Sequence, residues 1–282
     1  VTVKSRIKGN WIDDHSRIPI DDRKPFDEEV ARALKAVTEQ MDCSSAACIA
    51  AFPAEFVSFR NIKVPFGEKK KIRQILPFEL ETTLPMQPED IVADFHMLNG
   101  SGGRDAGNIL AAAVERQRLE SFLNLLKGCG IEPDVITVGG VALAQCLNRF
   151  GEKNNGQLLL NVDDFRVTLV VNRSGQVELV RSFACDVSRA NGMQALVARV
   201  RQTLAALEES TGNHYEIDDI RLSGGASGTP GLLAAIEEGN PWQIVSEHVY
   251  SGEEVTIRYK VENTGDFPVW PGTEYWTDHI WI

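Results

Sequence analysis

The stretch Leu160-Asn161-Val162-Asp163-Asp164-Phe165-Arg166-Val167-Thr168 runs from an apolar segment into a short polar turn and out into a second apolar segment. This alternation predicts a strand, a tight turn and a second strand. Such a turn can cradle a phosphate when glycine lets the backbone approach and few anions lie nearby. Here the turn holds Asp163 and Asp164 and no glycine. A triphosphate would therefore need a bridging divalent cation, and a hairpin entrance with two solvated acids is the favoured alternative.

A glycine-rich turn further along the chain is the second candidate ligand contact. Gly224, Gly225, Ala226 and Ser227 follow an expected strand at 219–222 and precede an expected helix that begins at Pro230. Glycine allows close backbone approach, and the start of a helix offers free N–H groups to an anion. Proline suits the first helical position. A strand-to-helix turn without a ligand explains the same pattern equally well.

The segments around these two turns repeat one order of elements. A polar linker at 151–156 separates two halves, and each half contains a β-hairpin followed by strands interleaved with helices. This order predicts a mixed α/β fold in two lobes rather than a β-sandwich. We expect a first lobe at 1–156, a second lobe at 157–239 and a separate β-rich segment at 240–282.

Two helices in the first half carry local signals. Apolar residues at helical spacing predict a helix at 68–82, and Pro77 within it is expected to kink or divide that helix. An amphipathic segment at 115–128 predicts a second helix with Gly128 at its C-cap. Apolar spacing predicts the two helices, whereas the kink and the C-cap are each predicted from one residue, Pro77 or Gly128.

Composition excludes several classes of function. The formal net charge of −11 argues against a general nucleic-acid coat, which needs a basic surface. The five cysteines form no CxxC pair and suit a reducing compartment, and the five histidines lack the spacing of metal ligands. We see no uninterrupted apolar run of about 20 residues that could span a bilayer. The chain opens with Val-Thr-Val-Lys rather than Met, so we expect an N-terminally incomplete fragment.

Three stretches carry a family resemblance: Phe52-Pro53-Ala54-Glu55-Phe56-Val57-Ser58-Phe59-Arg60, then Val64-Pro65-Phe66, then Ile75-Leu76-Pro77-Phe78-Glu79-Leu80-Glu81-Thr82-Thr83-Leu84-Pro85. Together with Leu179-Val180-Arg181-Ser182-Phe183 and the Ser-Gly-Gly-Ala-Ser turn, they resemble the PilM and GspL cytoplasmic domain family. These are actin-like proteins of type IV pilus and type II secretion machines. The resemblance covers roughly residues 1–239.

The resemblance implies an actin-like ATPase (ribonuclease H-like) fold with a nucleotide cleft between lobes and an inserted small subdomain at about 53–107. It implies that Gly224, Gly225 and Ala226 form the adenosine-side turn. Residues 161–168 would be the second phosphate loop, which in nucleotide-binding relatives reads Asp, apolar residue, Gly and later Thr. This chain has Asn161 in place of the Asp, Asp163 in place of the Gly, and Thr168 as the later Thr. The first phosphate loop would lie before Val1.

These departures favour a degenerate ATPase that serves as a scaffold. We expect a non-catalytic protein of a type II secretion or type IV pilus inner-membrane platform, on the cytoplasmic face of the inner membrane. Its expected partners are the N-terminal domain of the motor ATPase and other platform proteins, with a homodimer left open. The alternative is an active ATPase that binds ATP and Mg²⁺ through Gly224, Gly225, Asp163 and Asp164.

The last 43 residues indicate a different class of protein. Residues 240–282 hold four of the five tryptophans and an alternating segment at 255–261. They resemble the opening strands of a CARDB-type Ig-like repeat, which implies a cell-surface adhesion protein as a second alternative. The scattered cysteines and the helix-rich body argue against that alternative.

Overall fold

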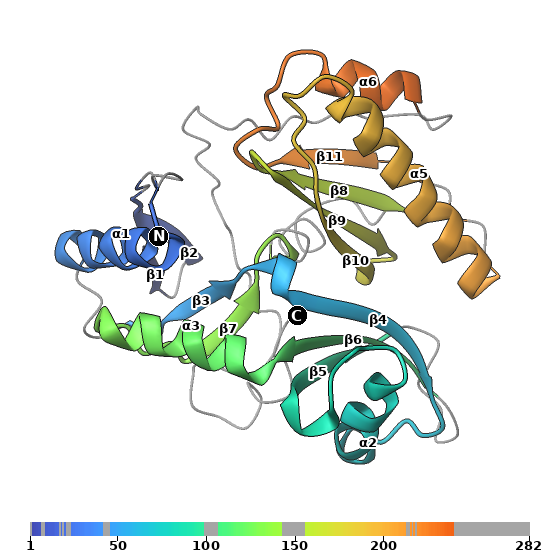
Figure 1. Ribbon diagram of the computed structural model, residues 1–282, viewed down its shortest axis with the longest axis horizontal. Coiled ribbons are helices and arrows are strands. Elements are labelled where there is room, and N and C mark those ends of the chain that lie inside the picture. Colours follow the sequence, from blue (N-terminus) through green and yellow to red (C-terminus); the bar gives the residue numbers. More distant parts are fainter. Residues whose placement is uncertain are drawn as a thin grey trace. The chain divides into compact units, whose positions relative to one another are not determined.

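The structure is a computed structural model, and it describes residues 2–6, 9–16, 18, 20, 24–41, 46–98, 107–142, 156–212, 215, 217 and 219–239 (Figure 1). The chain divides into two compact units. In the described part, the first unit holds the residues up to Phe52 and Glu115–Thr137, and the second holds Pro53–Val114 and the residues from Val138 to 239. The sequence also predicts a helix at 140–150, of which only residues 140–142 are described, with 141–142 helical; the segment at 240–282 lies outside the described residues.

The first unit combines two small sheets with two helices. Strands β1 (Thr2–Arg6) and β2 (Gly9–Asp14) pair antiparallel, and β3 (Ile49–Phe52) pairs with β7 (Val135–Val138). Helices α1 (Phe26–Gln40) and α3 (Arg116–Gly128) contact each other. The start of β3 is fixed by Asp134, whose carboxylate accepts the N–H of Cys48 at 2.7 Å.

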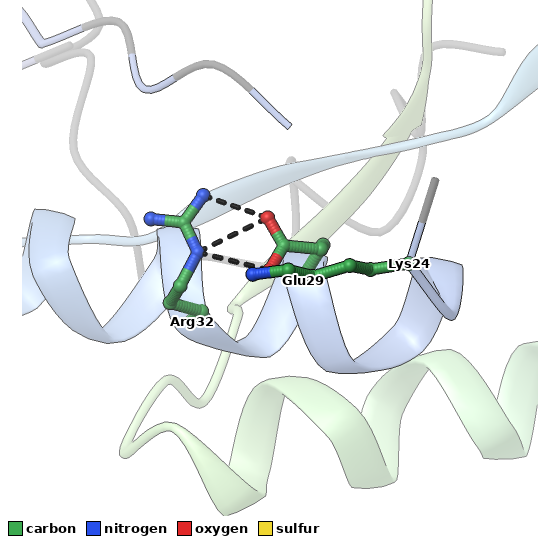
Figure 2. A network of polar contacts seen from close by, with 3 residues as sticks. All are labelled: Lys24, Glu29 and Arg32. Atoms are coloured by element: carbon green, nitrogen blue, oxygen red, sulfur yellow. Dashed lines mark hydrogen bonds and ion pairs between the residues drawn. The ribbon is translucent and has the colours of Figure 1, made fainter. Parts of the chain in front are cut away.

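A buried carboxylate anchors α1 (Figure 2). The Glu29 side chain is only 4% exposed, and its oxygens accept from Arg32 Nη2 at 2.9 Å and from Lys24 Nζ at 3.3 Å. Removing a carboxylate from water is costly unless hydrogen-bonded cations compensate. Both cations keep half or more of their side chains in water. The network therefore links the first turns of α1 to Lys24, two residues before the helix begins.

The second unit begins with a three-stranded sheet. After the short helix η1 (Ala54–Phe56) come β4 (Val57–Val64), α2 (Lys69–Glu81), η2 (Pro88–Asp90), β5 (Ile91–Met97) and β6 (Gly107–Glu115), with strand order β4-β6-β5. Helix α2 buries Ile72, Leu76 and Leu80 against this sheet. Pro77 does not divide α2, which is one continuous helix, so that part of the prediction was wrong.

A four-stranded sheet completes the second unit. It is formed by β8 (Gln157–Val162), β9 (Arg166–Arg173), β10 (Gln176–Ala184) and β11 (Asp219–Ser223), in the order β10-β9-β8-β11. Strands β8 and β11 run parallel, and the other pairs are antiparallel. Helices α5 (Gly192–Thr211) and α6 (Leu232–Gly239) share one apolar cluster with one face of the sheet (Figure 1).

Both faces of this sheet are buried. Leu158, Leu160 and Val162 belong to the helix-side cluster, whereas Leu159 packs with Phe59 of β4 and Leu110 of β6. Because successive side chains of a strand point to opposite faces, a strand covered on both sides reads as a continuous apolar run. This explains why the sequence predicts a strongly apolar strand at 157–161.

Two further details differ from expectation. The dipeptide Gly9-Asn10 is typical of a hairpin turn, but both residues lie within β2. Helix α3 ends at Gly128 with Cys129 as its C-cap, and the left-handed glycine is Gly130, at φ +76°. A glycine two residues beyond the expected one thus closes the helix. In the described part of the chain, no helix is both long and apolar enough to cross a membrane.

Candidate functional site

The expected site residues meet at one edge of the four-stranded sheet. Because β8 and β11 are parallel, their carboxyl ends lie together, with Asn161 next to Ser223 in register. On its other side Asn161 is paired with Thr168 of β9. Polar residues that end neighbouring parallel strands meet at such an edge, which is where α/β sheets usually bind ligands. The structure therefore gathers Asn161, Asp163, Thr168 and the turn at Gly224–Ser227 into one place.

Hydrogen bonds connect these residues in a line. Ser223 Oγ donates to Asn161 Oδ1 at 3.0 Å, and Asn161 Nδ2 donates to Asp163 Oδ2 at 3.0 Å. The backbone N–H of Gly225 donates to Asp163 Oδ1 at 3.3 Å. The Asp163 carboxylate thus accepts one bond from an amide side chain and one from the glycine-rich turn. The Gly225 N–H therefore already donates to an anionic group of the chain itself.

The glycine-rich turn is also packed against the end of β8. Ala226 N–H donates to the carbonyl of Val162 at 2.9 Å. Gly224 has φ +92°, and a Cβ built on it would lie 2.4 Å from the Val162 oxygen. No side chain fits in that space. Gly224 is therefore required for backbone packing, whether or not a ligand binds.

Other polar groups of the turn form hydrogen bonds within the turn. Ser227 donates through its N–H and its Oγ to the carbonyl of Gly224, at 3.2 and 2.8 Å. Helix α6 begins at Leu232 and not at Pro230, because Gly231 takes a left-handed φ of +82°. The expectation that Pro230 opens the helix was wrong. The start of the helix is thus separated from Ala226 by five residues.

Sequence reasoning missed two residues at this edge. A Cβ on Gly140, which has φ +82°, would lie 3.1 Å from Thr168 Cγ2 and 3.7 Å from Asn161 Cβ. Thr168 is buried, and its Oγ1 donates to Ser182 Oγ at 3.4 Å. The Gly139-Gly140 pair after a strand was the available signal for the first, since it marks a close backbone approach. Ser182 lies in the stretch 179–183 that carries the family resemblance, but nothing in the local sequence marked it as a site residue.

The turn between β8 and β9 is tight and exposed. Asp163 N–H donates to the Arg166 carbonyl at 2.8 Å, and Phe165 stands 59% exposed at its tip. Cys185 N–H donates to the Phe165 carbonyl. Burial, and secondarily the charge of Asp186, raises the pKa of the Cys185 thiol, which disfavours a reactive thiolate. Among the described residues, no group of three or more His, Cys, Asp or Glu side chains is placed to hold a metal ion.

A model of the family described as type II secretion system (T2SS), protein L, matches residues 27–172, just over half of the chain. The chain belongs to this family. The match includes Asn161, Asp163 and Thr168 and ends within β9, before the turn at Gly224. The family match therefore includes the turn after β8 but not the glycine-rich turn after β11.

Three solved structures are similar to this chain. The PilM protein of the PilM–PilN type IV pilus biogenesis complex is similar at a TM-score of 0.64 and 20% identity, over 76% of this chain and 73% of that chain. The cytoplasmic domain of EpsL, an inner-membrane component of the type II secretion system of Vibrio cholerae, gives 0.44 and 17%, over 74% and 79%. A Bacteroides thetaiotaomicron protein of actin-like ATPase fold and unknown function gives 0.48 and 12%, over 86% and 88%.

These likenesses confirm the predicted actin-like fold and the predicted PilM and GspL family. No curated protein matches the sequence. The chain is therefore a type II secretion protein of a family that shares its fold with a type IV pilus component.

Proposed function

We propose that this protein is a non-catalytic scaffold on the cytoplasmic side of the type II secretion inner-membrane platform, where it docks the N-terminal domain of the motor ATPase. The single observation that carries the non-catalytic part is the bond between Gly225 N–H and the Asp163 carboxylate. The family membership supports the place in the machine.

The Asp163 carboxylate stands where a phosphate oxygen would be expected. A nucleotide phosphate would have to displace it from the Gly225 N–H and would meet its negative charge. Two unit charges about 4 Å apart repel by about 1 kcal/mol in water and by about 4 kcal/mol at the effective dielectric constant of a protein surface. Because Asp163 is exposed, the lower figure applies until a ligand excludes the water. Either value weakens nucleotide binding.

Asn161 and Asp163 form a matched pair. An aspartate at position 161 could still accept from Ser223, but it would turn a carboxylate toward the carboxylate of Asp163. The Asn161 amide instead accepts from Ser223 and donates to Asp163. The two departures from the pattern of nucleotide-binding relatives thus depend on each other. This favours a structural role for Asn161 and Asp163 over a catalytic site that has lost part of its function.

The docking part rests on the family and on a precedent in the fold. PilM was solved in a complex with PilN, so a protein of this fold can take a protein partner. We expect the full-length chain to bind the purified N-terminal domain of its motor ATPase with a dissociation constant of tens of micromolar or tighter, measured by biolayer interferometry. The double variant D163G/N161D should bind equally well, because the proposed docking surface does not include the edge of the sheet that holds Asn161 and Asp163. No binding at those concentrations would contradict the scaffold proposal.

One observation favours a second candidate, an active ATPase. Asp163 and Asp164 lie next to a glycine-rich turn, and carboxylates can hold Mg²⁺ against phosphates. Tight, Mg²⁺-dependent ATP binding with phosphate release would support that candidate over the scaffold. The adhesion alternative depends on residues 240–282, which lie outside the described residues.

A further inference from the structure

Two arginines from different sheets of the second unit converge on one backbone oxygen. Arg60 of β4 donates through Nη1 to the carbonyl of Phe59 at 2.8 Å. Arg181 of β10 donates through its own Nη1 to the same carbonyl at 3.4 Å. We call these two residues the arginine pair. The two guanidinium groups therefore lie close together although the two arginines are 121 positions apart in sequence.

The arginine pair has no acidic partner in the described part of the chain. Four other arginines, all outside the pair, do contact a carboxylate: Arg32, Arg118, Arg166 and Arg189. Burial, and then the charge of Arg60, lowers the pKa of Arg181. Two like charges held together without a counterion are unfavourable, and the chain as a whole carries a net charge of −11. The chain has more acidic than basic residues, yet none of the acidic residues in the described part forms an ion pair with the arginine pair.

The backbone around the arginine pair is firmly held. Phe59 and Val180, the chain neighbours of Arg60 and Arg181, are buried in the cluster that joins the two sheets. Asn61 Nδ2 donates to the Glu178 carbonyl at 2.8 Å and ties β4 to β10. The pair is thus set in place before any ligand arrives, and preorganisation lowers the cost of binding.

We propose that the arginine pair binds a side-chain carboxylate, from Asp or Glu, of a partner protein. Each guanidinium has five N–H donors in a planar fork, and the structure engages one Nη of each with Phe59. The remaining donors match the two oxygens of a carboxylate. A bound carboxylate would also neutralise the repulsion between the two arginines.

Neighbouring features favour a polypeptide over a small anion. Arg181 is exposed and Arg60 is half-buried, so a chain segment can reach the arginine pair from solvent. Phe56 of η1 is 38% exposed and Phe165 is 59% exposed. The ion pair of Glu55 with Arg166, at 3.1 Å, joins the segments that carry these two rings. Arginine with exposed aromatic rings is the composition typical of protein interfaces.

The test is an NMR titration of the full chain with 15N-labelled arginine side chains. The probe is the blocked peptide Ala-Glu-Phe-Glu-Ala, and its control is the same peptide with both Glu replaced by Gln. We expect saturable shifts of the Nε–H signals of Arg60 and Arg181 with the Glu peptide, and affinity lower by about tenfold or more with the Gln peptide. Equal responses to both peptides, or no saturable response, would overturn the inference.

Variants separate the pair from general charge effects. Arg181→Gln and Arg60→Gln should each weaken binding of the Glu peptide by about tenfold or more, and Arg181→Lys by less, since lysine keeps the charge but loses the fork. Arg118→Gln, which removes an exposed arginine paired with Glu115, should change binding by less than about twofold. Inorganic phosphate and phosphatidylglycerol vesicles are run in parallel. Shifts with either of these but not with the Glu peptide would assign the site to phosphate and overturn the inference.

Discussion

The carboxylate of Asp163 and the backbone N–H of Gly225 form a hydrogen bond of 3.3 Å that joins the turn after β8 to the turn after β11. The two residues are 62 positions apart in sequence and belong to the two turns that sequence analysis singled out separately. The bond links them into one site. Under the proposed function, this carboxylate takes the place of a phosphate oxygen.

Removing that anion should uncover the phosphate-binding capacity of the turn. We expect Asp163→Gly to raise the affinity for ATP with Mg²⁺ by about tenfold or more, because it frees the Gly225 N–H and removes a repelling charge. Isothermal titration calorimetry measures the change. Gly225→Val in the same background should abolish the gain. An affinity unchanged by Asp163→Gly would show that the carboxylate does not limit nucleotide binding.

The matched pair can be tested by a double-mutant cycle. Asn161→Asp should lower the free energy of unfolding by about 1–3 kcal/mol, because the Asp163 carboxylate loses a donor and gains a like-charged neighbour. Adding Asp163→Gly should recover most of that loss. Urea unfolding followed by circular dichroism measures all four proteins. Additive effects of the two substitutions would contradict the coupling.

Gly224 offers a test of backbone packing. Gly224→Ala should destabilise the protein by more than about 2 kcal/mol, since the new Cβ meets the Val162 carbonyl and φ is positive. Gly175 is the matched control, because it has φ +78° but open space around its Cβ position. Gly175→Ala should cost only the backbone strain, about 1 kcal/mol. If the two variants lost equal stability in thermal unfolding, the contact of Gly224 with β8 would not contribute to the stability of the protein.

The buried Glu29 should matter more than an exposed glutamate. Glu29→Gln removes the charge that binds Lys24 and Arg32 and should cost about 2 kcal/mol of unfolding free energy. Glu115→Gln, at an exposed pair with Arg118, should cost less than about 0.5 kcal/mol. Chemical denaturation compares the two. A smaller loss for Glu29→Gln than for Glu115→Gln would argue against the network in Figure 2.

Asp94 on β5 predicts a dependence of stability on pH. Burial raises the pKa of Asp94 above its ordinary value, although Phe95 N–H, Arg73 and Lys69 oppose the shift. The folded state therefore holds the proton more tightly than the unfolded chain does. The stability that Asp94 contributes is complete below the ordinary Asp pKa of about 4 and is lost as the pH rises through the raised value.

Asp94→Asn should consequently raise the melting temperature at pH 7 and leave it nearly unchanged at pH 3. Differential scanning calorimetry at the two pH values measures this. Glu79→Gln, on the exposed surface of α2, serves as the control and should show no such difference. A loss of stability at pH 7 on Asp94→Asn would mean that Arg73 and Lys69 outweigh the burial of the carboxylate.

Local sequence predicted most of the strands and helices because their burial is regular. The strand, turn and strand predicted over 160–168 and the strand predicted at 219–222 are present as β8, β9 and β11. The errors fall where one residue was given too much weight: Pro77 within a helix whose apolar face is otherwise complete, Gly128 in place of Gly130, and Pro230 before a left-handed Gly231. In each case packing or a neighbouring glycine set the outcome.

The residues of the candidate site were named from the sequence, and their binding of a ligand stays a prediction, but the contacts between them were not foreseen. Parallel pairing of β8 and β11 brings Asn161 beside Ser223, and no local pattern encodes that neighbour. The role of Gly140 depends on the distance to Thr168, and the arginine pair depends on the contact between β4 and β10. Such features arise from packing between segments far apart in sequence. They become visible only once the sheets are assembled.

If Asp163 keeps this edge of the sheet from working as an ATPase, a calorimetric titration of the unaltered chain with ATP, with and without Mg²⁺, should show it. We expect no saturable binding up to about 1 mM, where the binding free energy would be about 4 kcal/mol, and no phosphate release. Micromolar binding that requires Mg²⁺ and is followed by release of phosphate would contradict it.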